Sequence, residues 1–142
     1  MSTRFSDIAH WFQTLSPETL EHVGDIYAQD AVFVDPFNQL EGLASVRAVY
    51  QHMFDTLKQP RFVVTTIVES ERNGFMTWDF LFECRGKAQQ ISGCTQFKLN
   101  DQGLIVLHRD FWDAAQQVYE KIPLLGSVVR MIRRKLSLPT TG

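Results

Sequence analysis

The second half of the chain changes its hydrophobic period from that of a helix to that of a strand, and this change most restricts the possible folds. After Pro60, apolar and polar residues alternate, and Val, Ile and Thr become frequent. Asn73-Gly74 is typical of a two-residue hairpin turn, and two further turn sequences follow it. We therefore expect an antiparallel meander of four strands at residues 61–73, 75–84, 88–99 and 104–112.

The first 60 residues predict helices and one short strand. Apolar residues spaced three and four positions apart favour helices, and Ser16-Pro17 is a typical helix start. Pro36 should end the strand that precedes it. The expected elements are helices at residues 4–14, 16–27 and 43–57, a strand at 31–35 and a loop at 38–42. This order predicts an α+β fold in which helices cover one face of a long, curved antiparallel sheet.

The alternation of side chains along two strands predicts which residues face the helices. In strand 75–84, one face carries Met76, Trp78, Phe80 and Phe82, and we expect it to be the concave, helix-covered face. In the last strand, Arg109 favours solvent. The opposite face, which should therefore point inward, carries His108, Asp110 and Trp112.

Two carboxylates lie in runs that are otherwise apolar. Asp35 ends the run 31–35, and Asp110 lies in the last strand beside His108. Burying a carboxylate costs several kcal/mol, roughly, unless it is paired, hydrogen-bonded or protonated. If both runs line one cavity, Asp35, Asp110 and His108 are candidate acid–base residues.

Two motifs resemble those of a known family. Residues 28–36, Ala-Gln-Asp-Ala-Val-Phe-Val-Asp-Pro, resemble the pattern Ala-Asp-Asp-Ala-Thr-Val-Glu-Asp-Pro of ketosteroid isomerases. Phe97-Lys98-Leu99-Asn100, followed by Gly103, resembles their Phe-Arg-Phe-Asn-x-x-Gly hairpin. With the order of elements, residues 5–113 resemble the nuclear transport factor 2-like superfamily, in its ketosteroid isomerase and SnoaL-like cyclase branches.

The resemblance implies a cone of curved sheet that is closed by helices around one deep pocket, and a fold that often dimerises through its sheet. It places Asp35 at the position of the isomerase's base. At the isomerase's two oxyanion-hole positions the chain has Trp11 and Thr95, and neither is the acidic donor that a dienolate needs. Classical steroid isomerase activity is therefore not expected. Asp110 resembles the acid that polyketide cyclases and limonene-epoxide hydrolases carry on this strand.

Each candidate also has a structural interpretation. Asp35 could accept backbone N–H groups in the turn at Pro36. His108 and Asp110 could form a purely structural pair. Aromatic residues at these spacings are more often core than ligand wall, although in this fold the core opens into the pocket. The predicted substrate-binding residues are Trp11, Trp78, Phe80, Phe82, Thr95 and Trp112.

Composition and charge restrict partners and location. The net charge is −2, and no basic face outside the tail predicts nucleic-acid binding. No His/Cys/Asp spacing predicts a metal site, and we expect no cofactor. Cys84 and Cys94 favour free thiols over a disulfide, and the N-terminus has no apolar leader, so a cytoplasmic protein is expected.

We expect a single domain over residues 1–142. Residues 114–142, with five basic residues and one acidic residue, form a basic amphipathic helical extension in this interpretation. That helix could pack on the protein itself or on a partner, or could touch a membrane surface.

Three functions are consistent with these features. The first is a cofactor-free acid–base isomerase, cyclase or hydrolase that acts on an apolar, carbonyl-bearing small molecule. The second is a non-catalytic binding protein with the same pocket. The third is an assembly module, with a homodimer as its expected form.

Overall fold

The computed structural model describes residues 3–112, which form two α-helices, one 3-10 helix and a six-stranded sheet. The chain order is α1 (Arg4–Gln13), η1 (Thr19–Asp25), β1 (Tyr27–Val34), β2 (Gln39–Glu41), α2 (Leu43–Thr56), β3 (Lys58–Ser70), β4 (Asn73–Cys84), β5 (Lys87–Leu99) and β6 (Ile105–Phe111). The predicted C-terminal helix lies outside the described residues.

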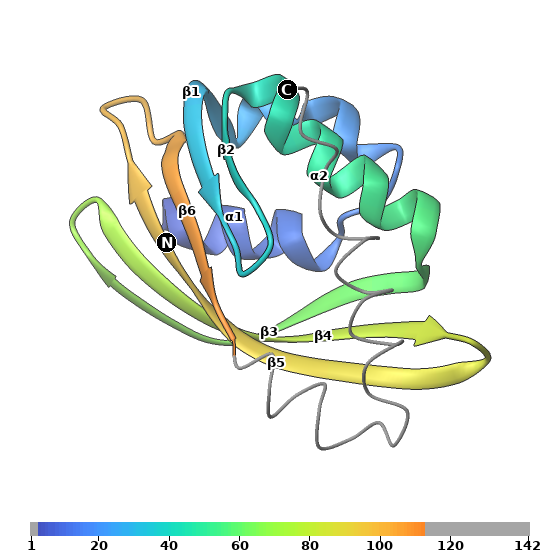
Figure 1. The fold of residues 1–142 in the computed structure, drawn as a ribbon. Coiled ribbons are helices and arrows are strands. Elements are labelled where there is room, and N and C mark those ends of the chain that lie inside the picture. The colour runs from blue at the N-terminus through green and yellow to red at the C-terminus, as the bar shows by residue number, and fades with distance from the viewer. Residues whose placement is uncertain (1–2, 113–142) are drawn as a thin grey trace.

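The sheet is strongly curved, and the helices lie inside the curve (Figure 1). Its strand order is β2-β1-β6-β5-β4-β3, so the expected meander of β3 to β6 is present. All neighbours in it are antiparallel except β1 and β6, which are parallel, with Phe33 beside His108. The α+β class with a curved sheet is therefore confirmed, but the sheet is mixed rather than wholly antiparallel.

The start of β1 was predicted wrongly. Tyr27 was expected at the end of the second helix, but it begins the strand, and the helix is a 3-10 helix that stops at Asp25. Tyr27 pairs with Ile105 of β6, and both side chains are fully buried. This long-range pairing outweighs the local helical spacing. The expected loop at 38–42 also contains a short strand, β2, which pairs with β1.

The hairpin between β3 and β4 also differs from its prediction. Its turn is Glu71-Arg72, since Ser70 already pairs with Asn73. Gly74 is needed for another reason. A Cβ built on it would lie 2.4 Å from the ring of Phe5, so the missing side chain lets α1 pack closely on the sheet.

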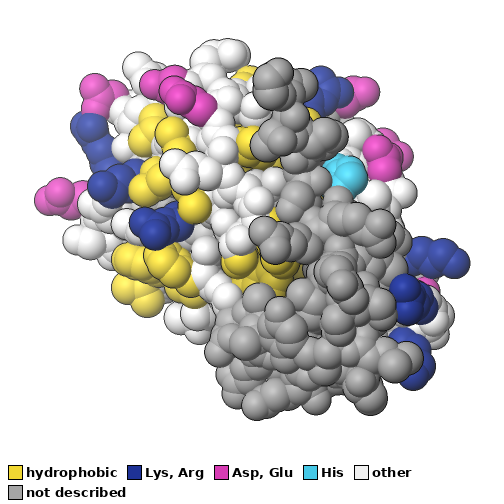
Figure 2. All heavy atoms as spheres, in the orientation of Figure 1, with side chains coloured by type: hydrophobic (Ala, Val, Ile, Leu, Met, Phe, Trp, Pro, Cys, Tyr) yellow, Lys and Arg dark blue, Asp and Glu magenta, His cyan; other side chains and the backbone are white. Residues whose placement is uncertain are grey.

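The predicted strand alternation is confirmed in β4 and β6. Met76, Trp78, Phe80 and Phe82 are buried in the core, while Arg109 and Phe111 are exposed on the outer face. The large exposed apolar side chains include Val63, Val68, Phe75 and Phe111. In the orientation of Figure 1, hydrophobic side chains also lie exposed beside Lys and Arg side chains (Figure 2). Packing of a second copy on the outer face of the sheet stays a prediction.

Within residues 3–112, neither α-helix is long and apolar enough to cross a bilayer. Cys84 and Cys94 are free thiols.

Candidate functional site

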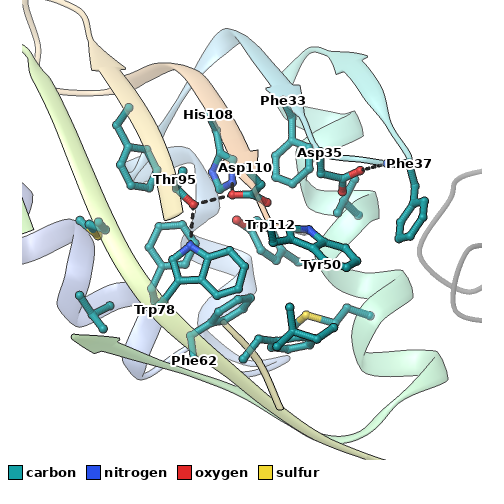
Figure 3. A pocket seen from close by; sticks show the side chains of 18 residues that line it. Phe33, Asp35, Phe37, Tyr50, Phe62, Trp78, Thr95, His108, Asp110 and Trp112 are labelled. Atoms are coloured by element: carbon teal, nitrogen blue, oxygen red, sulfur yellow. Dashed lines mark hydrogen bonds and ion pairs between the residues drawn. The ribbon is translucent and has the colours of Figure 1, made fainter. Parts of the chain in front are cut away.

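The parallel pair of β1 and β6 brings the two candidate carboxylates together. Phe33 lies beside His108 and Val34 beside Arg109, so the next inward-facing positions along the two strands are Asp35 and Asp110. Both side chains line one cavity between the sheet and α2 (Figure 3). The two acids are 75 positions apart in the sequence and meet because both strands run in the same direction.

The cavity is compact and mostly aromatic. Its volume is about 80 Å³, well below the roughly 300–1,000 Å³ of pockets for drug-sized ligands. The lining residues are Phe12, Phe33, Asp35, Phe37, Val49, Tyr50, Met53, Phe62, Val64, Met76, Trp78, Phe80, Ile91, Thr95, Phe97, His108, Asp110 and Trp112. A ligand of this cavity would touch rings on most sides and only a few polar atoms.

Asp35 is held by the loop that follows β1. Its Oδ1 accepts hydrogen bonds from the backbone N–H groups of Phe37 (2.7 Å) and Asn38 (2.6 Å). The side-chain amide of Asn38 donates to both carboxylate oxygens, at 3.2 and 3.1 Å. The turn geometry explains why an Asp before Pro36 fits here, and it fixes the carboxylate at the edge of the cavity.

Burial raises the pKa of the Asp35 carboxyl above its ordinary value. The hydrogen bonds from Phe37 and Asn38 lower this pKa, and the negative charge of Asp110 raises it, but burial is the largest influence. A carboxylate with a raised pKa is a stronger base than an ordinary Asp side chain, which suits proton abstraction.

Asp110 is fixed by two buried donors, one on either side. Its Oδ1 lies 2.5 Å from the hydroxyl of Thr95 and 2.7 Å from Nε2 of His108. The Thr95 oxygen in turn accepts the indole N–H of Trp78 at 2.8 Å. Because an indole N–H can only donate, the Thr95 hydroxyl hydrogen is left to point at Asp110. Within residues 3–112, Oδ2 of Asp110 has no hydrogen-bond partner.

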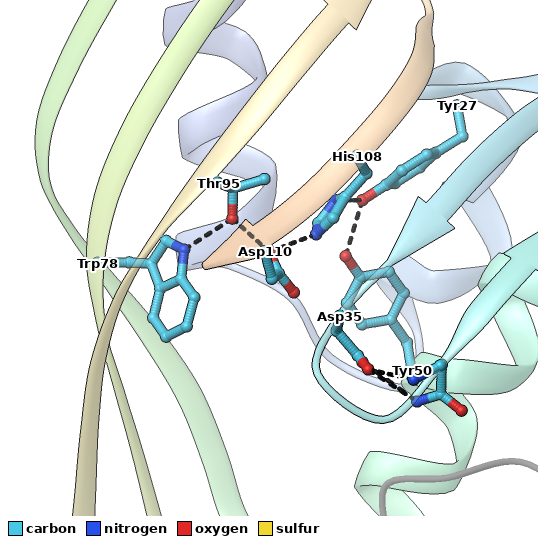
Figure 4. A network of polar contacts seen from close by, with 8 residues as sticks. Tyr27, Asp35, Tyr50, Trp78, Thr95, His108 and Asp110 are labelled. Atoms are coloured by element: carbon cyan, nitrogen blue, oxygen red, sulfur yellow. Dashed lines mark hydrogen bonds and ion pairs between the residues drawn. The ribbon is translucent and has the colours of Figure 1, made fainter. Parts of the chain in front are cut away.

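His108 continues the network to two tyrosines (Figure 4). Its Nδ1 lies 2.7 Å from the hydroxyl of Tyr27, which lies 2.7 Å from the hydroxyl of Tyr50. Burial raises the pKa of both phenols well above the ordinary value, so both stay protonated. With neutral His108, the simplest arrangement has Tyr50 donating to Tyr27, Tyr27 to Nδ1, and Nε2–H to Asp110.

This chain of hydrogen bonds can reverse its direction. If His108 gains a second proton, Nδ1–H donates to Tyr27 and the hydroxyl of Tyr27 donates to Tyr50. The hydroxyl hydrogen of Tyr50, which lines the cavity, is then free to donate to a ligand. The imidazole is 3% exposed and packs against the ring of Phe33 at 4.3 Å, so the network is held rigidly.

The structure brings most of the predicted site residues to one place. Asp35, Asp110 and His108 line the cavity, and so do the predicted contact residues Trp78, Phe80, Thr95 and Trp112. Their chemical roles stay predictions.

Two predicted contact residues lie elsewhere. Trp11 packs edge-on against Phe12, Tyr27 and Tyr50, behind the cavity wall, because α1 turns it toward these rings. Phe82 packs against Phe80, one step further along β4 than the cavity reaches.

Sequence reasoning missed Tyr27 and Tyr50. Both lie within the helices expected at residues 16–27 and 43–57, and neither was named as a site residue. The signal that could have found them is chemical, because a buried phenol needs a partner for its hydroxyl. Among the described residues, no group of three or more His, Cys, Asp or Glu side chains could hold a metal ion.

Residues 8–108 match the SnoaL-like domain family. The chain belongs to this family. No curated protein matches the sequence significantly.

Solved structures share the SnoaL-like fold of the chain. A hypothetical protein from Catenulispora acidiphila with a ketosteroid isomerase-like fold, in complex with trimethylamine, is 10% identical, with a TM-score of 0.69 over 84% of this chain and 92% of that one. An epoxide hydrolase from M. tuberculosis is 17% identical, with a TM-score of 0.67 over 91% and 92%.

A third solved structure is a candidate SnoaL-like polyketide cyclase from Shewanella putrefaciens. It is 15% identical, with a TM-score of 0.70 over 87% of this chain and 88% of that one. At these identities the three structural similarities establish only the fold. The chemistry has to be inferred from the site of this chain.

One glycine makes room for the cavity wall. A Cβ on Gly93 would lie 2.6 Å from the Trp78 ring and 3.0 Å from the Phe111 carbonyl. We expect Gly93→Ala to push the indole away from Thr95 and to lower the free energy of unfolding by about 1–3 kcal/mol. Chemical denaturation measures this loss. Gly24→Ala, which meets only an ordinary 3.5 Å contact, is the control. Equal losses in both variants would contradict the close packing of Trp78.

Proposed function

We propose that this SnoaL-like protein is an acid–base enzyme that moves a proton on a small, largely apolar, carbonyl-bearing substrate, as an isomerase, cyclase or hydrolase. The observation that carries the proposal is the meeting of two carboxylates from parallel strands in one aromatic cavity. One has a raised pKa, and the other is hydrogen-bonded to a buried histidine. Two titratable groups in different environments suit the removal and return of a proton.

In this proposal Asp35 removes a proton from a carbon next to the carbonyl group. The C–H electrons move toward the carbonyl oxygen, and Asp35 becomes neutral. In an isomerase or cyclase, Asp35 then returns this proton to another atom of the substrate, while Oδ2 of Asp110 accepts a hydrogen bond from the substrate. In a hydrolase, Asp110, oriented by His108, instead holds a water at Oδ2 and takes its proton as the water oxygen attacks the substrate, and a protonated Asp35 gives its proton to the leaving oxygen. The reversible network behind His108 lets Tyr27 and Tyr50 adjust their hydrogen bonds to the proton's position.

The structural neighbours support these reaction classes. The M. tuberculosis protein is an epoxide hydrolase, and the S. putrefaciens protein is a candidate polyketide cyclase. The same fold therefore serves an epoxide hydrolase and a candidate polyketide cyclase, which are two of the reaction classes proposed here.

A second candidate function is ligand binding without catalysis. The observation that favours it is the set of hydrogen bonds from Phe37 and Asn38, which would suit Asp35 as a structural residue of the turn. Among residues 3–112 no group bonds Oδ2 of Asp110, which favours the enzyme instead, because a purely structural carboxylate would be expected to have both oxygens bonded.

Hydrogen exchange at carbon tests the proposal without knowledge of the substrate. We would incubate the protein in D₂O with small ketones such as acetylacetone, cyclohexanone and phenylacetone, and follow loss of the α-proton signals by NMR. The wild type is expected to speed exchange in at least one ketone. The double variant Asp35→Asn/Asp110→Asn is expected to fall to the buffer rate.

Asp30→Asn/Asp55→Asn is the matched control, since both of these acids are exposed and lie outside the cavity. Exchange that survives in Asp35→Asn/Asp110→Asn would contradict these two residues as the acid–base pair. Exchange that never exceeds the buffer rate in the wild type would favour the binding protein.

A further inference from the structure

The charged groups that line the cavity have one sign. Of the 18 lining residues, Asp35 and Asp110 are acidic and none is Lys or Arg. The nearest arginine in sequence, Arg109, points to the outer face, where its guanidinium lies over the Phe111 ring at 5.2 Å. Among the described residues that line this cavity, His108 is the only basic one, and Arg109 borders the same two carboxylates only in a second, more open hollow.

The negative charge of the two carboxylates changes the pKa of neighbouring groups. The charge of Asp110 raises the pKa of Asp35, Tyr50 and Cys94 in addition to the effect of burial, and Asp35 acts on Tyr50 in the same direction. A cavity with this potential repels an anionic ligand and attracts a cation. A neutral ligand does not offset the negative potential of the cavity.

The walls favour an organic cation over a metal ion. Ring faces attract ammonium groups, particularly when the group is taken out of water. Phe37 and Trp112 form an edge-to-face pair at 5.5 Å, and Figure 3 shows Asp35 between Phe33 and Phe37 with Trp112 close by. A hard metal ion needs more oxygen ligands than this cavity offers, and the described residues hold no metal-binding group.

The size of the cavity limits the cation. At about 10–15 Å³ for each water, 80 Å³ holds roughly five to eight waters. An alkylated ammonium group is compact and weakly hydrated, so it suits a small space with aromatic walls.

We propose that the substrate is a compact organic cation, whose alkylated ammonium group packs on Phe37 and Trp112 in the field of Asp35 and Asp110. The inference rests on the proposed function, because it names the class of substrate for the same acid–base site. The single positive charge of the ammonium partly offsets the two carboxylates, and the carbonyl-bearing end of the substrate lies within reach of Asp35.

Binding of a charged probe and its neutral isostere tests this inference. Choline and 3,3-dimethylbutan-1-ol have the same shape and differ in one positive charge. Titration followed by NMR is expected to give a dissociation constant about tenfold lower for choline in the wild type. In Asp35→Asn/Asp110→Asn the preference is expected to fall to about twofold or less, while Asp30→Asn/Asp55→Asn keeps it. Trp112→Leu, which keeps both carboxylates, is expected to weaken choline more than the alcohol.

Equal affinity for choline and the alcohol in the wild type would overturn the inference, and so would a preference that survives in Asp35→Asn/Asp110→Asn. The two proposals can fail separately. Exchange in neutral ketones without a choline preference overturns only the cationic substrate. A choline preference without proton exchange in any ketone, including trimethyl(2-oxopropyl)ammonium, supports the cation site and overturns the acid–base enzyme.

Discussion

Asp35→Asn is expected to lower the rate of carbon-proton exchange by about 10²–10⁴-fold, the range that a positioned general base contributes. An amide has nearly the shape of the carboxylate, and its oxygen can still accept the N–H groups of Phe37 and Asn38. The turn should therefore survive while the base is lost. The rate is measured by NMR in D₂O, with Asp30→Asn as the control.

The pH dependence provides a second readout for the same variant. A base acts only when it is deprotonated, so the wild-type rate should rise with pH as Asp35 loses its proton. Because burial raises the pKa of Asp35, this rise should occur above the ordinary value of 3.8. Asp35→Asn should abolish the rise. An unchanged pH profile in the variant would assign the base to another residue.

Stability should respond in the opposite direction. A raised pKa in the folded state means that folding favours the protonated form of Asp35. This contribution is fully present below the ordinary pKa and is lost as pH rises through the raised pKa. The free energy of unfolding of Asp35→Asn should therefore improve relative to the wild type as pH rises from 4 toward neutral. A variant that loses activity while it keeps or gains stability has lost chemistry and not the fold.

Much of the site was predictable because strand alternation is local. Arg109 needs solvent, and this requirement alone turns His108 and Asp110 inward. The same rule places Trp78 and Phe80 on the concave face, where both line the cavity. These predictions used only neighbouring residues and the period of a strand.

The meeting of Asp35 with Asp110 could be expected only from the resemblance. Nothing in residues 31–35 says that their strand runs parallel to β6, because this pairing joins segments about 75 residues apart. The start of β1 was missed for a related reason. Tyr27 has helical spacing with Val23, but its backbone pairs with β6 and its hydroxyl bonds to His108 and Tyr50.

The sequence also could not predict which of the buried residues line the cavity. Phe80 and Phe82 have the same parity in β4, yet only Phe80 reaches the cavity. Trp11 shares its helix face with Phe12, but α1 turns Trp11 toward the tyrosines and Phe12 into the cavity wall. Periodicity gives the buried face of an element, and tertiary packing decides which buried residues surround empty space.

Asp110→Ala is expected to lower the free energy of unfolding by about 2–5 kcal/mol. The change removes the acceptor of two buried donors, the hydroxyl of Thr95 and Nε2–H of His108. Each buried donor that loses its partner costs about 1–3 kcal/mol. Thr95 and His108 are 2% and 3% exposed, so bulk water cannot easily replace the carboxylate. Chemical denaturation of the wild type and variant measures the loss.

Asp110→Asn separates the structural role of this residue from its charge. The amide oxygen can take the place of Oδ1 and keep both hydrogen bonds, so we expect a loss of only about 1 kcal/mol. Its NH₂ group would lie where Oδ2 faces the cavity, and could neither accept nor return a proton. Asp30→Ala, at an exposed position, should change stability by less than about 0.5 kcal/mol. If Asp110→Ala and Asp110→Asn cost the same, the bonds to Thr95 and His108 do not stabilise the fold.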